Sequence, residues 1–212
     1  MKRKELQYQT VKPLLRSTLK RLMEIDEFKP FRLVGGTSLS LRYGHRMSDD
    51  IDLFTDAEYG SLDFQLLQDI LRREFPYCQG DCGEIVGFGT SYLVGNSTND
   101  NVKVDLFYTD PFIRPMEQRD KIRMASVDDI VAMKMEVISR GGRKKDFWDL
   151  HMLRNHYSEE QMLTLYEERY PYGATKEECV AGLTNFSVAD TEPDPICLQD
   201  KVWQLIKLDF VK

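Results

Sequence analysis

The sequence predicts an α+β fold, in which a mixed sheet with helices is followed by a helical C-terminal part. Two features of the 212 residues support this prediction. Up to about residue 125, short segments of alternating polarity stand between turn signals and interleave with segments of helical period. After that residue, the apolar positions recur almost only at helical spacing. We therefore expect an α+β domain at 1–125 and a helical domain at 126–212.

The first part should begin with a helix and then alternate between strands and helices. Residues 11–25 carry apolar side chains at helical spacing. Residues 31–36 predict a short strand that ends in a Gly-Gly turn, and 37–44 predict a two-turn helix followed by a glycine. The later segments follow the same criteria and predict a strand at 50–55, a helix at 62–75, and strands at 84–89, 90–95, 101–109 and 121–126.

The second part opens with a helix-start signal. Ser126 and Asp129 have the spacing of a capping box, with Ser126 as the N-cap. The rest of this part should be helical, except for a loop at 189–196 that contains two prolines. Helices are expected at 128–140, 144–157, 158–170, 176–186 and 197–210.

The composition limits the classes of protein to which this chain can belong. A hydrophobic fraction of 42% and a charged fraction of 30% are typical of globular proteins. No apolar run approaches the roughly 20 residues of a membrane span, and the first 15 residues lack the apolar run of a signal peptide. The four cysteines form no C-x-x-C pair, which argues against a zinc site. We expect a cytoplasmic protein without a membrane partner.

The distribution of charge along the sequence says more about the ligand than the net charge does, and it suggests an anionic substrate. The net charge of −6 argues against a protein that coats nucleic acid. Residues 140–145, however, hold four cations in six positions, while 159–200 hold ten acidic residues and two basic ones. A basic surface beside an acidic tail would suit an anionic substrate at one end of the molecule. The alternative is a charged surface that only faces solvent.

Three aspartates should converge on one face of the sheet. In a strand, residues i and i+2 share a face, so Asp50 and Asp52 point opposite to Ile51 and Leu53. The same alternation in 101–109 places Asp105 on the polar face of its strand. If the two strands are neighbours, the carboxylates repel one another unless a cation compensates them. One or two Mg²⁺ ions would turn them into a hard-oxygen site for phosphoryl transfer. A D-x-D pair alone is also common at strand ends that bind no metal.

The glycines before this strand favour a phosphate ligand. Gly35 and Gly36 would let the backbone approach a ligand closely. The helix that follows, with Thr37 and Ser38 near its start, would offer unpaired N–H groups and the positive end of a dipole. Phosphate donors next to metal-binding carboxylates indicate a nucleoside triphosphate (NTP).

Arg46 and Ser48 stand between the glycines and the carboxylates. Arg46 is positioned to hold triphosphate oxygens, or alternatively to balance Asp49. Ser48 either contacts the ligand or orients the turn before the strand. The sequence leaves these alternatives open.

These residues match a known family. The segment GGTSLSLRYGHRMSDDIDLF resembles the signature of the AbiEii/AbiGii-type nucleotidyltransferases, which are toxins within the polymerase-β-like nucleotidyltransferase superfamily. A second block at 122–153 is also similar to this family, whose members carry a helical Lys, an Arg and a K-D-x-x-D-L element. The positions that correspond to the two patterns are Gly35, Gly36, Ser38, Asp50, Asp52 and Asp105, and then Lys134, Arg140, Lys145, Asp146, Asp149 and Leu150.

The resemblance implies a polymerase-β-like fold and a chemistry. A Mg²⁺-dependent enzyme of this kind moves a nucleoside monophosphate from an NTP to an acceptor, either RNA (the tRNA 3′ end is one possibility) or protein. It would act as the toxin of a toxin–antitoxin or phage-defence system with a cognate antitoxin protein. The metal ligands would be Asp50, Asp52 and Asp105, and Asp105 would also serve as the base or activate the acceptor hydroxyl. The tail after about residue 158 matches nothing in the family pattern and does not identify the acceptor.

The second block would complete the nucleotide cleft. Lys134 lies in an apolar helical run, where it could extend along its methylene chain to solvent. The resemblance implies instead that Lys134 reaches the NTP phosphates, together with Lys145. Asp146 would then hold Lys134 or an arginine, or contact the nucleotide. Two alternatives to a nucleotidyltransferase remain: a catalytically weak nucleotide-binding module of the same fold that acts through a protein partner, and a D-x-D glycosyltransferase that uses a nucleotide-sugar.

Overall fold

The computed structural model describes residues 5–83 and 87–212 and contains one seven-stranded sheet. The order of the strands across the sheet is β3-β4-β5-β2-β1-β7-β6. The pairs β2–β5 and β1–β7 are parallel, and the other pairs are antiparallel, so the sheet is mixed as predicted. The strands are β1 (Arg32–Leu33), β2 (Asp50–Thr55), β3 (Tyr77–Gln79), β4 (Gly89–Ser97), β5 (Asp100–Tyr108), β6 (Glu117–Arg119) and β7 (Ile122–Met124).

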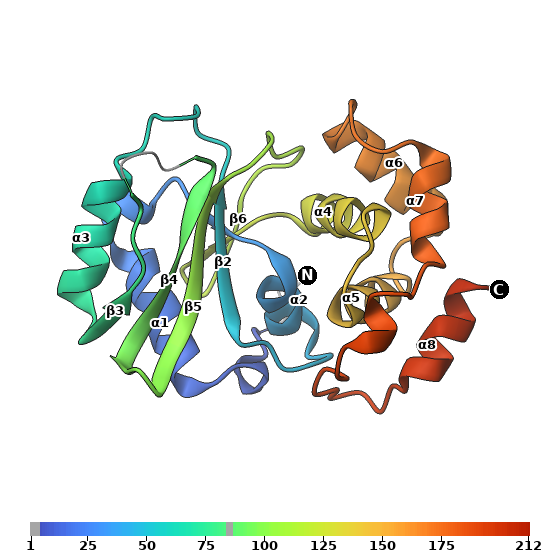
Figure 1. Ribbon diagram of the computed structural model, residues 1–212, viewed down its shortest axis with the longest axis horizontal. Coiled ribbons are helices and arrows are strands. Elements are labelled where there is room, and N and C mark those ends of the chain that lie inside the picture. Colours follow the sequence, from blue (N-terminus) through green and yellow to red (C-terminus); the bar gives the residue numbers. More distant parts are fainter. Residues whose placement is uncertain (1–4, 84–86) are drawn as a thin grey trace.

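The helices divide between the two faces of the sheet. Figure 1 shows α1 and α3 on one side, and α2 with the helices α4 to α8 on the other. The α-helices are α1 (Pro13–Glu24), α2 (Gly35–Tyr43), α3 (Phe64–Glu74), α4 (Val127–Ser139), α5 (Lys144–Leu153), α6 (Glu159–Arg169), α7 (Lys176–Leu183) and α8 (Trp203–Phe210). Short 3₁₀ helices lie at Tyr8–Thr10, Asp26–Phe28 and Ala189–Thr191.

Period-2 alternation in the central strands separates the core from the site. Ile51 and Leu53 of β2 are fully buried and join a hydrophobic cluster with Leu15 and Leu19 of α1. Asp50 and Asp52 of the same strand face the opposite side, where α2, α4 and α5 lie. One face of the sheet therefore anchors the fold, and the other is available for chemistry.

The helical region has its own hydrophobic cluster. Most of its buried members come from α4 to α8, and Val34, Leu39 and Ala125 of the first part join them. The helix-start prediction at Ser126 is confirmed, because the Ser126 hydroxyl accepts the Asp129 N–H at 3.0 Å. The two regions therefore meet along packed side chains, and the division at residue 125 stays a prediction.

Several predicted boundaries were wrong. The strand predicted at 31–36 ends at Leu33, and Gly35 and Gly36 form the first turn of α2 instead of a turn before it. The helix predicted at 197–210 begins at Trp203, because the preceding backbone pairs with the segment before β2: the Met47 N–H donates to Ile196 O at 2.9 Å and the Leu198 N–H to His45 O at 2.9 Å.

Two short strands, β3 and β6, were not predicted. Each has only three residues, and its pairing with a longer neighbour, β4 or β7, decides its conformation. The strand predicted at 84–89 includes residues 84–86, which lie outside the described residues, and the next two residues form a turn.

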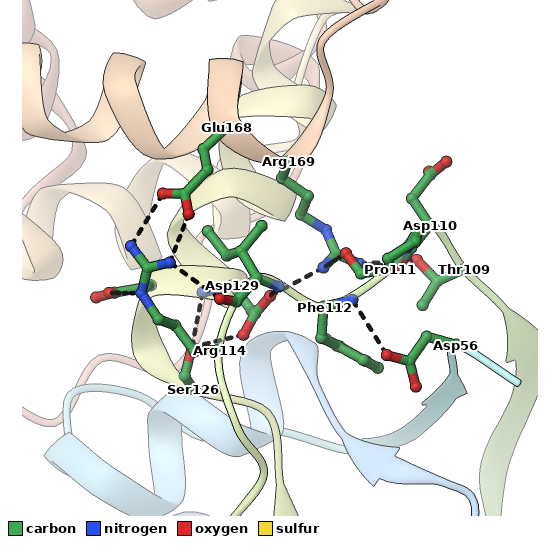
Figure 2. A network of polar contacts seen from close by, with 12 residues as sticks. Asp56, Thr109, Asp110, Pro111, Phe112, Arg114, Ser126, Asp129, Glu168 and Arg169 are labelled. Atoms are coloured by element: carbon green, nitrogen blue, oxygen red, sulfur yellow. Dashed lines mark hydrogen bonds and ion pairs between the residues drawn. The ribbon is translucent and has the colours of Figure 1, made fainter.

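A buried ionic network joins the loop after β5 to the helical region (Figure 2). Arg169 of α6 donates to Asp129 Oδ1 at 2.9 Å, and neither side chain is exposed to solvent. The same guanidinium donates to the carbonyls of Asp110 and Pro111 at 2.9 Å. Asp129 also accepts the Ile113 N–H at 2.7 Å. These contacts fix the path of the loop at 109–113, which forms one edge of the cavity described below.

Over residues 5–83 and 87–212, no helix is both long enough and apolar enough to cross a bilayer.

Candidate active site

A cavity of about 320 Å³ lies between the polar face of the sheet and the helical region. Residues of β2 and β5 form one wall, and residues of α4 and α5 form another. Of the predicted site residues, all except Thr37 and Ser38 line this cavity. The lining members of the predicted set are Gly35, Gly36, Arg46, Ser48, Asp50, Asp52, Asp105, Lys134, Lys145 and Asp146.

The three predicted carboxylates lie on neighbouring strands. In the parallel pair β2–β5, Asp52 lies directly opposite Asp105, and Asp50 lies opposite Lys103. The expectation that the two strands are neighbours is therefore confirmed. The side chains of Asp50, Asp52 and Asp105 are all only partly exposed on this face.

The Asp52 carboxylate lacks a direct ion-pair partner among the described residues. Its side chain makes no hydrogen bond or ion pair with any of the described residues, although it lies between two other carboxylates. Burial, together with the negative charges of Asp105 and Asp50, outweighs the opposing charges of Lys134 and Lys145 and raises the pKa of Asp52 to about 6. A cation in this position would relieve the repulsion.

The outer two carboxylates are paired with lysines. Lys145 Nζ lies 3.4 Å from Asp50 Oδ2. Asp105 receives hydrogen bonds on both oxygens, from Ser91 Oγ at 2.5 Å and from Lys103 Nζ at 2.6 Å. Within the described ranges, no three His, Cys, Asp or Glu side chains are already grouped as a metal cage. The oxygen donors nevertheless fit Mg²⁺ in their chemistry.

Behind the carboxylates, Asp149 of α5 is the centre of a buried ionic cluster. The carboxylate accepts from Arg46 through Nε at 2.7 Å and Nη2 at 2.8 Å, and it pairs with His45 Nε2 at 2.7 Å. Lys134 Nζ lies 2.7 Å from Asp149 Oδ2 and 2.6 Å from Asp146 Oδ1. The cluster joins the segment before β2 to α4 and α5.

The charges in this cluster support one another. Burial alone would raise the pKa of Asp149, but Arg46 and Lys134 outweigh burial and hold it well below its usual range. Burial would likewise lower the pKa of Lys134, but Asp146 and Asp149 outweigh that effect and raise it. Both groups are therefore ionised at neutral pH.

The structure changes the interpretation of two basic residues. Arg46 pairs with Asp149, so the alternative that it balances Asp49 was wrong; Asp49 pairs instead with Lys12 at 3.3 Å on the surface. Lys134 is 6% exposed and does not extend to solvent, because two carboxylates hold its ammonium. Of the alternatives for Asp146, the geometry favours the one in which it holds Lys134.

At each of the two glycines, a different neighbouring side chain leaves no room for a Cβ. Gly35 has a φ of +66°, and a Cβ there would collide with the Asp52 carboxylate. A Cβ on Gly36 would collide with the Arg46 guanidinium. Gly35 thus allows the start of α2 to lie against the carboxylates, and Gly36 leaves room for the ionic cluster.

The side chains of Thr37 and Ser38 are buried away from the cavity. Thr37 Oγ1 bonds to Ser48 Oγ at 2.7 Å and to the carbonyl oxygen of Asp50. Ser38 Oγ accepts from Arg42 Nε at 3.4 Å. The hydrogen bonds of Thr37 therefore stabilise the turn that leads into β2. If Thr37 and Ser38 bind the nucleotide as predicted, they would do so through backbone groups.

Lys103 and Ser91 were missed in the sequence. Lys103 precedes Asp105 by two residues and so shares its face of β5, which the period-2 rule could have revealed. Ser91 lies on β4 and meets Asp105 only through the register of β4 with β5. The apolar part of the cavity wall was also missed and consists of Val34, Phe54, Ile130, Met133, Val137 and Tyr170.

The fold of this chain is that of solved nucleotidyltransferase structures. MenT4, a nucleotidyltransferase toxin from Mycobacterium tuberculosis H37Rv, superposes with a TM-score of 0.61 at 16% identity, over 91% of this chain and 78% of that one. JHP933 from Helicobacter pylori superposes with a TM-score of 0.54 at 16% identity, over 92% and 86% of the two chains. The predicted fold is therefore confirmed.

The sequence identifies the family. Residues 17–210 match the family described as nucleotidyl transferase AbiEii toxin, type IV toxin–antitoxin system. The chain belongs to this family, which confirms the resemblance seen in the sequence. An uncharacterized protein of Aquifex aeolicus (strain VF5) is 32% identical over 148 residues, which are 66% of this chain and 66%, just under two thirds, of that relative.

Proposed function

We propose that this chain transfers a nucleoside monophosphate from an NTP to a hydroxyl group of an RNA or protein acceptor, with Mg²⁺ as cofactor. The observation that carries the proposal is the placement of Asp52 opposite Asp105, without a direct ion pair and with a raised pKa, in a cavity that also contains basic side chains. Membership of the AbiEii family supports a role as a toxin that is controlled by an antitoxin protein.

The carboxylates Asp50, Asp52 and Asp105 would hold one or two Mg²⁺ ions. When bound, such ions stabilise charge on the attacking and leaving oxygens of a phosphoryl displacement. Asp52 would bind with the least rearrangement, because nothing else pairs with its side chain among the described residues. Asp50 would bind through Oδ1, because Lys145 meets only its Oδ2, and Asp105 would have to release Lys103 or share its carboxylate with it.

The donor nucleotide would occupy the cavity of about 320 Å³. Lys145 and Arg143, whose side chains are 35% and 55% exposed, make only long ion pairs of 3.4 and 3.6 Å among the described residues and could turn toward a triphosphate. Lys134 would have to leave a buried carboxylate that it meets at 2.6 Å. The apolar wall around Phe54 and Met133 suits the flat face of a base and excludes water from the phosphates.

The acceptor has room in a second cavity of about 350 Å³. This cavity shares Asp50, Ser48 and Lys145 with the first, and residues 192–196 close its far side. In the proposed step, the acceptor oxygen bonds to the α-phosphorus as the bond to the pyrophosphate oxygen breaks and pyrophosphate leaves. The hydroxyl proton passes to a carboxylate of the first cavity, for which we propose Asp105.

The test is transfer of label from each α-³²P-NTP to total RNA and to protein, with Mg²⁺ or with EDTA. Asp50→Asn and Asp52→Asn should each abolish the transfer. Asp26→Asn is the matched control, because Asp26 lines neither cavity and pairs with Lys29 at 2.9 Å on the surface. Transfer that survives in EDTA or in either variant would refute the proposal. Nucleotide binding without transfer by the wild type would favour the alternative of a binding module that acts through a partner.

A further inference from the structure

Lys103 occupies a special position among the three carboxylates. It lies across the strand pair from Asp50 and shares a face of β5 with Asp105. Its ammonium is 2.6 Å from Asp105 Oδ2, and its side chain, which is 44% exposed, lines the cavity. Lys145 meets Asp50 at a longer distance of 3.4 Å. The closest lysine–carboxylate contact on this face is therefore that of Lys103.

Asp105 has no free oxygen as long as this contact persists. Oδ2 is held by Lys103, and Oδ1 accepts from Ser91 Oγ at 2.5 Å. A divalent cation that uses Asp105 has to displace the ammonium or share the carboxylate with it. In either case the positive charge of Lys103 opposes the cation.

We propose that Lys103 is a positioning residue that serves as the resident counter-ion of Asp105 and lowers the affinity of the site for a bare divalent cation. This inference rests on the proposed function. Once displaced, the ammonium stays on the wall of the cavity, where its charge favours a triphosphate. Lys103 thus opposes the metal alone and favours the metal together with the nucleotide, so the two ligands bind better as a pair.

The consequence is a pair of effects with opposite signs. Removal of the lysine should tighten the binding of Mn²⁺ alone by about tenfold, because a unit charge that lies roughly 4–5 Å from a divalent ion is lost. The same change should weaken binding of a non-transferable NTP analogue in saturating Mn²⁺ at least threefold, on the order of one lost charge–phosphate contact. A residue that only supports the fold would not move the two affinities in opposite directions.

The experiment measures both affinities by calorimetry, with Mn²⁺ binding checked by electron paramagnetic resonance. The variants are Lys103→Met and the conservative Lys103→Arg, and the control is Lys29→Met, which removes a surface lysine that pairs with Asp26 at 2.9 Å. Lys103→Met should show both effects, Lys103→Arg should restore values near wild type, and Lys29→Met should change neither. Ser91→Ala, which frees only Oδ1 of Asp105, should tighten Mn²⁺ binding by a smaller factor.

The outcomes separate this inference from the proposed function. Wild-type protein that binds Mn²⁺ while Lys103→Met binds it equally or more weakly would overturn the role of Lys103 and leave the enzyme assignment intact. Wild-type protein without any Mn²⁺ binding, with or without the nucleotide analogue, would overturn both. Opposite shifts in the two affinities support the inference.

Discussion

Asp52→Asn should make the metal-free protein more stable although it abolishes transfer. Ionised Asp52 lies between Asp50 and Asp105 and has no partner for its charge among the described side chains. Asparagine keeps the shape of the side chain and removes the charge. This expected gain in stability is unusual, because most substitutions at partly buried positions destabilise a folded protein.

The magnitude follows from the pKa of Asp52, which rises from 3.8 to about 6 on folding. Such a change costs the ionised folded protein at most roughly 3 kcal/mol, since one pKa unit corresponds to about 1.4 kcal/mol. The side chain keeps some contact with water, so we expect a gain of about 1–3 kcal/mol. For a protein of this size, that gain would raise the melting temperature by roughly 3–10 °C.

The effect has a defined pH dependence. Between pH 3.8 and about 6 the folded protein holds the Asp52 proton more tightly than the unfolded chain does, so the contribution of this group to stability falls as pH rises through that interval. Urea denaturation in EDTA at pH 5 and pH 7.5 measures it. The advantage of Asp52→Asn should be larger at pH 7.5 and should shrink when wild type is given Mg²⁺.

The control is Asp49→Asn, which removes an exposed ion pair with Lys12 and should change stability by at most about 0.5 kcal/mol. If Asp52→Asn in EDTA at pH 7.5 were equal to or less stable than wild type, the reasoning about a carboxylate without a direct ion pair would be refuted.

Three further predictions concern the cluster behind the carboxylates and the glycine beside them. Asp149→Ala should lower the free energy of unfolding by about 3–5 kcal/mol, because it leaves buried cations without their main partner; a loss under 1 kcal/mol in urea would contradict this. Lys134→Met and Asp146→Asn should each slow single-turnover transfer at least about tenfold, roughly 1.4 kcal/mol, and the double variant should be little worse. Fully additive losses would instead give the two residues separate roles. Gly35→Ala should weaken Mn²⁺ binding and cost about 1–2 kcal/mol of stability, because a Cβ at φ +66° meets Asp52; unchanged Mn²⁺ affinity would count against this placement.

The local patterns of the sequence were enough to place the carboxylates. Strand alternation in 50–55 and 101–109 put Asp50, Asp52 and Asp105 on one face, and the register of β2 with β5 confirms it. The face of a strand on which a side chain lies follows from its position in the local sequence, so it can be predicted without knowledge of the fold.

Contacts between distant segments could not be seen in this way. Arg46 and Asp149 are 103 positions apart, and the sequence offered Asp49 as a nearer partner for the same arginine. The start of α8 at Trp203 likewise depends on backbone bonds between 196–198 and 45–47, which outweigh the helical pattern of the residues before it. The identity of the ionic partners is a property of tertiary packing, and no local pattern encodes it.

The distance along the chain between Arg46 and Asp149 also determines when the cavity can exist during synthesis. A ribosome that adds about 5–20 residues per second needs roughly 5–20 s to cover the 103 positions between them. For most of that interval, from residue 55 to residue 127, the strand with Asp50 and Asp52 has been made, but the helices α4 and α5 that form the facing wall have not. A nascent chain therefore has no closed pocket for a nucleotide, and it gains one only after α5 has been translated and folded against the sheet.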